Sequence, residues 1–238
     1  MPGSLTPPSL APASRLARRR AREREIVDAT RRLFDERGLQ DARIENIARA
    51  VGINKALIYR HFSSKEELFV LTLVSYLSDL AQRLDEVDRA QEPQDQLRDG
   101  WRGYTDYCLE HPAFLDCSLS LMRAPASELR DSVSEAVWLR LGRGMAECLG
   151  KLARILAEGA EQGAFGVQDP DFTANRLYTQ TLGTMHLARL GVGVRRATSG
   201  LPETFPIDPR RVQDACIADA MASVGVPDAD QLRTRAAG

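Results

Sequence analysis

The amino-acid sequence predicts an all-α protein with a small three-helix head at the N-terminus and a larger helical body behind it. Apolar residues recur at three- and four-residue spacing over most of the 238 residues, which is the period of an amphipathic helix. No segment alternates apolar and polar residues as a half-buried strand does, and we expect no strand. Gly and Pro fall between the periodic segments, where helices end.

The head begins with a predicted helix over residues 21–37, with Gly38 placed to end it. The basic segment SRLARRRARERE before it is either a helical extension or a flexible arm. A short second helix covers about residues 44–51, and a third contains Leu57, Ile58 and Phe62. These three helices form the predicted head.

A fourth helix is predicted from Lys65 to about residue 87. The preceding SSKEEL motif indicates a capping box, in which the Ser64 hydroxyl accepts from the third helical amide and Glu67 reaches back. The predicted body helices cover about residues 95–110, 112–123, 127–163, 170–191 and 208–224. The predicted domains are a disordered basic arm at 1–20, the head at 21–66, the body at 67–227 and a tail at 228–238.

Composition is that of a globular protein, with 43% hydrophobic and 27% charged residues. No apolar run is long enough to span a membrane, and the start has no apolar core like that of a secretory signal, so we expect a cytoplasmic protein with no membrane partner. The four cysteines stand singly among apolar neighbours, which favours buried free thiols over disulfides or a zinc site.

Charge is divided unevenly along the chain. Residues 1–65 contain fourteen Lys and Arg against seven Asp and Glu, a net charge of +7, so the remainder carries −8 of the total of −1. A basic head on an acidic body is typical of a protein whose head binds a polyanion. A solvated charged surface explains the same count equally well.

The stretch IENIARAVGINKALIYRHF breaks and restarts a helix at Gly52. We expect Gly52 to adopt a positive φ at a tight turn where a Cβ would clash, with Ile53 filling the corner and Ile58 packing the later helix onto the earlier one. Two helices that cross through such a turn form a helix-turn-helix, whose second helix enters a DNA major groove. An ordinary helical corner is the alternative.

The chemistry of that second helix favours DNA. Lys55, Tyr59 and His61 suit phosphate or base-edge contacts, Arg60 suits guanine, and Leu57 offers an apolar contact, for example to a thymine methyl.

The segment GLQDARIENIARAVGINKALIYRHFSSKEELF resembles the DNA-binding head of the TetR family of transcriptional regulators. The resemblance covers about residues 25–71. It implies an all-α homodimer with an N-terminal DNA-binding head and a C-terminal effector-binding and dimerisation domain. The family is usually repressive, so it implies a repressor released from a near-palindromic operator by a small molecule.

Position by position, the resemblance implies a DNA-binding set. Asn54 starts the recognition helix, Lys65 meets a phosphate, and Arg43 stands where family members commonly have Thr or Ser. That departure leaves Asp41 to cap the helix while Arg43 contacts phosphate. The implied DNA-binding residues are Arg43, Asn54, Lys55, Leu57, Tyr59, Arg60, His61 and Lys65. The arginines of the basic arm either reach flanking DNA or belong to a solvated tail.

The body is expected to supply a dimer interface and an effector pocket. The resemblance implies a four-helix bundle built from helices 170–191 and 208–224 of two copies, with an intrachain core as the alternative for their apolar stripes. Those stripes comprise Leu177, Gln180, Thr181, Gly183, Thr184, Met185 and Leu187, then Val212, Cys216, Ile217, Ala220, Met221 and Val224.

Aromatic and sulfur-containing side chains of the body are candidates for an apolar effector pocket. They are Trp101, Tyr104, Tyr107, Cys108, Phe114, Leu121, Met122, Trp138, Met145 and His186. No residue pattern indicates a catalytic site, a metal site or a cofactor. The remaining alternatives are an all-α enzyme and a small-molecule carrier without a role on DNA.

Overall fold

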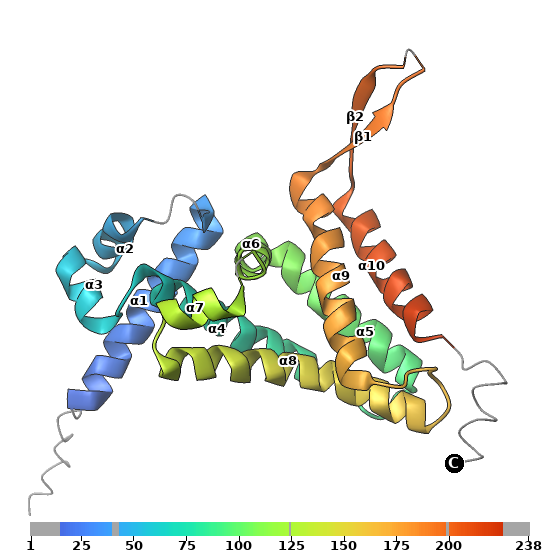
Figure 1. Cartoon of the computed structure of the whole chain (residues 1–238), viewed down its shortest axis with the longest axis horizontal. Helices are drawn as coiled ribbons and strands as arrows, with labels where there is room; N and C mark the ends of the chain where they lie inside the picture. The colour runs from blue at the N-terminus through green and yellow to red at the C-terminus, as the bar shows by residue number, and fades with distance from the viewer. Residues whose placement is uncertain (1–14, 40–42, 124, 199, 226–238) are drawn as a thin grey trace, which may run out of the picture.

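The computed structural model describes residues 15–39, 43–123, 125–198 and 200–225. The expected tail at 228–238, the first fourteen residues and Asp41 lie outside them. The described chain is almost entirely helical, as predicted, with the head at one end and the body at the other (Figure 1). No helix in these ranges is both long and apolar enough to cross a bilayer.

The head consists of α1 (Arg15–Arg37), α2 (Ile44–Val51) and α3 (Lys55–His61). Helix α1 buries Ile26, Leu33 and Phe34 against α2, α3 and α4. It begins at Arg15, so residues 15–20 form a helical extension, one of the two alternatives that the sequence left open, although the predicted domain division placed them in a disordered arm. Gly38 ends the helix with φ 76° and donates its N–H to the Phe34 carbonyl at 2.9 Å.

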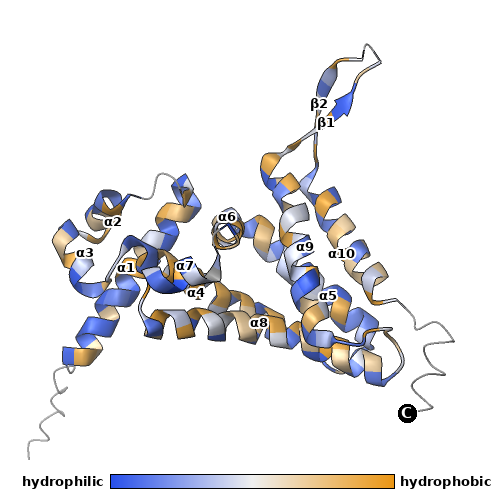
Figure 2. Cartoon of the chain, viewed as in Figure 1, coloured by the Kyte–Doolittle hydropathy of each residue, from blue (hydrophilic) through white to orange (hydrophobic). Residues whose placement is uncertain are grey.

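Helix α4 (Lys65–Asp85) runs from the head into the body, where α8 packs along it. The body helices are amphipathic and bury hydrophobic residues between them (Figure 2). They are α5 (Pro93–Glu110), α6 (Pro112–Leu121), α7 (Ala126–Ser132), α8 (Glu135–Glu161), α9 (Pro170–Leu190) and α10 (Pro209–Val224).

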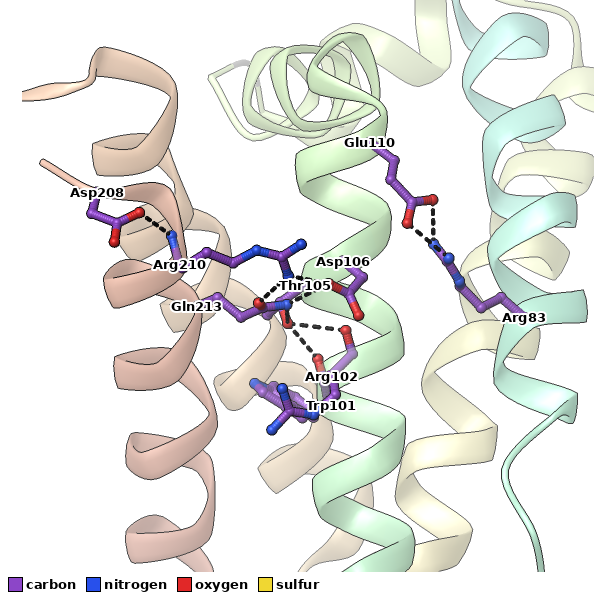
Figure 3. Close-up of polar contacts among 9 residues, drawn as sticks. All are labelled: Arg83, Trp101, Arg102, Thr105, Asp106, Glu110, Asp208, Arg210 and Gln213. Atoms are coloured by element: carbon purple, nitrogen blue, oxygen red, sulfur yellow. Dashed lines mark hydrogen bonds and ion pairs between the residues drawn. The ribbon is translucent and has the colours of Figure 1, made fainter.

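Polar side chains fasten α10 to α5 (Figure 3). The Gln213 amide donates to Thr105 Oγ1 at 3.1 Å and to Asp106 Oδ1 at 2.8 Å, and Arg210 pairs with the same carboxylate at 3.1 Å. Gln213 is buried, so these bonds satisfy an amide that would otherwise destabilise the core. Nearby, Trp101 donates its indole N–H to Thr181 and ties α5 to α9.

Two expectations about the secondary structure of the body are wrong. The single helix expected over 127–163 is broken at Val133, whose backbone is extended (φ −129°, ψ 158°), giving α7 and α8. The Gly/Pro-rich segment after α9 forms two antiparallel strands, β1 (Val192–Arg196) and β2 (Pro202–Pro206), where no strand was expected.

The apolar stripes of α9 and α10 are mostly intrachain core. Of the residues expected at a dimer interface, eight are buried within this chain, whereas Gln180, Gly183 and Leu187 are exposed. The eight are Leu177, Thr181, Met185, Val212, Cys216, Ile217, Ala220 and Val224.

Candidate nucleic-acid interface

The corner between α2 and α3 is built around Gly52. Its backbone is left-handed (φ 71°, ψ 31°), and the Ile53 N–H reaches back to the Ala48 carbonyl at 2.9 Å while the Gly52 N–H bonds Arg49 at 3.2 Å. This is a Schellman motif, in which glycine avoids the strain of a positive φ. The expected steric clash is wrong, because a Cβ on Gly52 would meet no heavy atom within 4 Å.

Helix α3 is anchored by its apolar side and capped at its start. Ile58 is fully buried and Phe62 nearly so, which fixes the helix against the head. The Asn54 side-chain oxygen accepts the Leu57 N–H at 2.8 Å, so Asn54 acts as the N-cap. Leu57 itself is half-buried.

Several polar residues of the head are exposed to solvent. Tyr59 is 45% exposed, and Lys55 and Arg60 on the same helix are also exposed. Arg43 precedes α2 and Lys65 begins α4, and both are exposed. A tyrosine among cations on a projecting helix combines base-edge, stacking and phosphate-binding capacity.

Lys55 is paired with Glu45 of α2. Its Nζ lies 2.6 Å from Glu45 Oε1, and both side chains are about half exposed. The hydrogen bond with Lys55 lowers the pKa of Glu45 and raises the pKa of Lys55. The ammonium group of Lys55 is therefore already held in an ion pair within the head.

His61 differs from its expected position on the exposed side. Its side chain is only 14% exposed, and its Nδ1 lies 3.6 Å from Glu23 Oε1 of α1. Glu23 also pairs with Arg19 at 2.9 Å, and Arg22 pairs with Glu25 at 2.8 Å. His61 is thus a contact between α3 and α1, and part of the basic segment is neutralised within its own helix.

A buried carboxylate joins the head to the body. Glu67, only 6% exposed, accepts hydrogen bonds from the Ser63 N–H, the Ser63 hydroxyl and the Ser134 hydroxyl. The Ser64 hydroxyl accepts the Glu67 N–H at 3.0 Å, as the capping box predicts, but Glu67 reaches Ser63 instead of Ser64. The Ser64 hydroxyl also donates to the Ser132 carbonyl at 3.0 Å.

The pKa of Glu67 reflects two opposed effects. Burial raises it, whereas the hydrogen bonds from Ser134 and Ser63 lower it, and the net direction is downward. The serine cluster therefore holds Glu67 ionised. The turn after α3, through Ser63, and the break between α7 and α8, through Ser134, are consequently hydrogen-bonded to the same carboxylate.

A second junction lies between α1 and the body. Arg31 stacks 4.3 Å from the Tyr76 ring centre and pairs with Asp79, and the Tyr76 hydroxyl donates to Asp35 at 2.6 Å. The Tyr107 hydroxyl donates to the Tyr76 carbonyl at 3.0 Å and accepts from the Arg31 guanidinium at 3.4 Å. Tyr107, expected in an effector pocket, is thus part of the contact between head and body.

The other pocket candidates lie at different places in the described part of the chain. Tyr104 and Met145 line a small apolar cavity of about 10 Å³ between α4, α5, α8 and α9, a volume no larger than one water molecule needs. Trp101, Cys108 and Phe114 are buried, Trp138 and His186 are half-buried, and Met122 is 46% exposed. Leu121 instead lines a larger cavity of about 310 Å³ between the head and α6 and α7.

Sequence reasoning missed two acidic residues that shape this surface. Glu45 looks like an ordinary exposed helical residue until α3 brings Lys55 beside it across the corner. Glu67 was recognised only as half of a capping box, and its contact with Ser134 joins positions 67 residues apart. Neither contact has a local signal in the sequence.

A family model described as bacterial regulatory proteins, tetR family, matches residues 26–71. The HTH-type transcriptional regulator Rv1816 of Mycobacterium tuberculosis is 40% identical over 87 residues, which are 35% of each chain, so the chain spans about a third of that relative. The repressor AcnR of Corynebacterium efficiens is 27% identical over 185 residues, 77% of this chain and 88% of AcnR.

Solved structures share the fold of the whole described chain. The structure of RolR in complex with resorcinol superposes with a TM-score of 0.64 at 18% identity, covering 91% of this chain and 94% of RolR. The TetR family regulator PfmR from Thermus thermophilus gives 0.57 at 22% identity, covering 84% and 96%. At these identities the likeness establishes the fold.

Proposed function

The chain belongs, through residues 26–71, to the TetR family of bacterial regulatory proteins, and on that premise we propose that it is a transcriptional repressor. In this proposal a homodimer binds a near-palindromic DNA operator and is released by a small, largely apolar effector. The observation that carries it is the exposed side of α3, where Lys55, Tyr59 and Arg60 project from a helix held rigidly by Ile58.

The DNA contacts divide by chemistry. Tyr59 and Arg60 are placed to read base edges, whereas Lys65, Arg43 and Lys55 suit phosphates. Lys65 also stands at the N-terminus of α4, where free amide groups favour an anion. His61 supports this surface from behind through its contact with α1.

Two heads are needed for specific binding, because one short helix contacts few bases. We assign the pairing surface to the exposed faces of α9 and α10, where small side chains allow helices of two copies to approach closely. These residues are Thr179, Gly183, Ala215, Ala218 and Ala222. Most of the apolar residues that the sequence predicted at the interface are instead buried beneath this face, in the core of the same chain.

The effector acts through the body. The apolar region around Tyr104 and Met145 admits a ligand only if α5, α8 and α9 separate, and α8 begins next to Ser134, which bonds Glu67. A ligand that favours the separated state would shift the heads away from DNA through its differential affinity for that state. RolR, solved with resorcinol, is a protein of the same fold that binds a small aromatic molecule.

Salt dependence tests the DNA-binding part of the proposal. The purified protein should bind its operator, selected from genomic fragments, with an affinity that falls steeply between about 50 and 200 mM salt as Lys and Arg displace counterions. Fluorescence anisotropy measures this directly. A flat binding curve over that range contradicts the proposal.

A paired substitution tests the surface itself. Lys55→Ala with Tyr59→Ala should weaken operator binding at least about tenfold, since it removes the proposed phosphate contact of Lys55 together with the base-edge contact of Tyr59, and a base-edge contact is worth ~1–3 kcal/mol. Arg98→Ala in α5 removes a cation from the body and should leave binding unchanged. If the chain were a small-molecule carrier, the paired substitution would change no measurable property.

A further inference from the structure

The hairpin formed by β1 and β2 has two chemically different faces. Residues opposite each other in the pairing share a face, and successive residues alternate between faces. One face carries Gly193, Arg195, Glu203 and Phe205. The other carries Val192, Val194, Arg196, Pro202, Thr204 and Pro206.

The first face is satisfied within the hairpin. The Phe205 ring lies directly over Gly193, where a Cβ would come within 2.5 Å of the ring. The Arg195 guanidinium covers the same ring at 5.7 Å and pairs with Glu203 at 3.0 Å. The residues of this face therefore pack and pair with one another within the hairpin.

The second face has no such cover in the described part of the chain. Val192 is 50% exposed and Val194 71%, and Leu201 beside the turn is 67% exposed. An isolated two-stranded hairpin is marginally stable in water and normally packs one face against another element. The valine face of this hairpin is therefore uncovered by the described residues and available to pack on another surface.

The position of the hairpin indicates which surface that is. It projects beyond the C-terminal end of α9 and the N-terminal end of α10 (Figure 1). Its valine face is joined in sequence to Leu187 and Leu190, which are 42% and 54% exposed at that end of α9. The opposite end of α9 exposes Phe172, at 64%.

Symmetry brings these two ends together. In a two-fold dimer each surface patch meets the same partner patch in reverse. If the axis crosses α9 near Gly183 and Thr179, whose side chains allow close approach, the C-terminal end of one α9 lies against the N-terminal end of the other. The hairpin then extends past the bundle and along the second copy.

We propose that the hairpin is an arm that packs its Val192 and Val194 face on a second copy of this chain, beside the partner's Phe172. The proposal rests on the homodimer of the proposed function and adds a second contact between its two subunits. The arm enlarges an interface whose centre consists of small side chains, and its apolar contact supplies affinity that the centre lacks.

The first test is dimer affinity by analytical ultracentrifugation of the full chain. Val194→Asp should raise the dissociation constant of the dimer at least about tenfold. Leu139→Asp is the matched control, because Leu139 is 50% exposed on α8, away from the arm. Replacing residues 193–205 by Gly-Ser-Gly should weaken the dimer similarly while circular dichroism shows unchanged helix content.

The second test is cross-linking. The four native cysteines are buried, so Val194→Cys with Phe172→Cys introduces the accessible thiols. These positions lie near opposite ends of α9, whose 21 residues span about 30 Å, beyond the reach of a short bismaleimide within one chain. A covalent dimer is expected from the double variant, and Leu139→Cys with Phe172→Cys should give none.

A Val194→Asp dimer as tight as the Leu139→Asp dimer, or absence of the covalent dimer, overturns the arm. If Val194→Asp changes neither dimer affinity nor operator binding, the arm is wrong but the proposed function is not contradicted. A wild-type chain that is monomeric, or that ignores DNA, would instead overturn the proposed function and the arm with it.

Discussion

At the scale of single residues, the pair Lys55 and Glu45 governs how much positive charge the head offers to DNA. The two side chains are about half exposed, so their pairing contributes little to stability. In the proposed function its effect is on binding, because a phosphate would compete with Glu45 for the lysine. The free protein therefore carries a built-in competitor on α2.

Glu45→Gln should strengthen operator binding. Removing the carboxylate that lies 2.6 Å from Lys55 Nζ leaves this cation unpaired for a phosphate, so a several-fold gain in affinity per head is expected. Anisotropy titrations at fixed salt measure the change. Glu147→Gln, which removes a carboxylate near Lys151 of the body, is the control and should leave affinity at the wild-type value.

At the scale of elements, the corner at Gly52 sets the direction of α3. Its requirement is conformational, since φ is 71° and the space around a Cβ is open. A substitution of Gly52 therefore tests the strain of a positive φ alone, without a steric clash of the new side chain. The turn after α3 is set differently, by the hydrogen bonds that Glu67 accepts from Ser63 and Ser134.

Gly52→Ala should destabilise the chain by about 1–2 kcal/mol, the strain of a left-handed alanine. Gly52→Asn should destabilise it less, because asparagine tolerates that conformation. Urea denaturation followed by circular dichroism measures both. Equal losses for the two variants would contradict a purely conformational role.

Acid stability tests Glu67. Because its folded pKa lies below the ordinary 4.5, its contribution is present above pH 4.5 and is lost as pH falls through the lowered pKa. Glu67→Gln should therefore be less stable than wild type by about 1–3 kcal/mol at pH 7. The difference should shrink below pH 4.5.

Ser134→Ala removes one hydrogen bond to the same carboxylate and should give an intermediate loss at pH 7. Thermal melts across pH 3–7 would show both effects. A Glu67→Gln variant whose loss is the same at every pH would contradict the assignment of that stability to the ionised carboxylate.

At the scale of the whole molecule, the features that could be predicted from the sequence are those that depend on neighbouring residues alone. The left-handed corner at Gly52, the helix stop at Gly38 and the Ser64 cap follow from glycine conformation and capping chemistry. The break at Val133 was missed because no Gly or Pro marks it. It coincides with contacts from Ser132 and Ser134 to α4 and the turn before it, which are tertiary.

The hairpin and His61 were misjudged for related reasons. A short strand pair rich in Gly and Pro has the composition of a loop, and Phe205 stabilises it only because it meets Gly193 across the pairing. His61 lies inward, with its Nδ1 3.6 Å from Glu23 of another helix, a neighbour that the local sequence does not reveal. Which residues line a pocket depends on how several helices pack against one another. Residue type alone therefore correctly grouped Tyr104 and Met145, which line one cavity, but not the other candidates.

The division of charge noted in the sequence gives the folded molecule an electrical polarity. With residues 1–65 at +7 and the rest at −8, the molecule has a large dipole along its length although its total charge is nearly zero. Near a duplex such a dipole experiences a torque that turns the head forward, while the acidic end is repelled. Collisions in the wrong orientation become rarer, so orientation is corrected during approach.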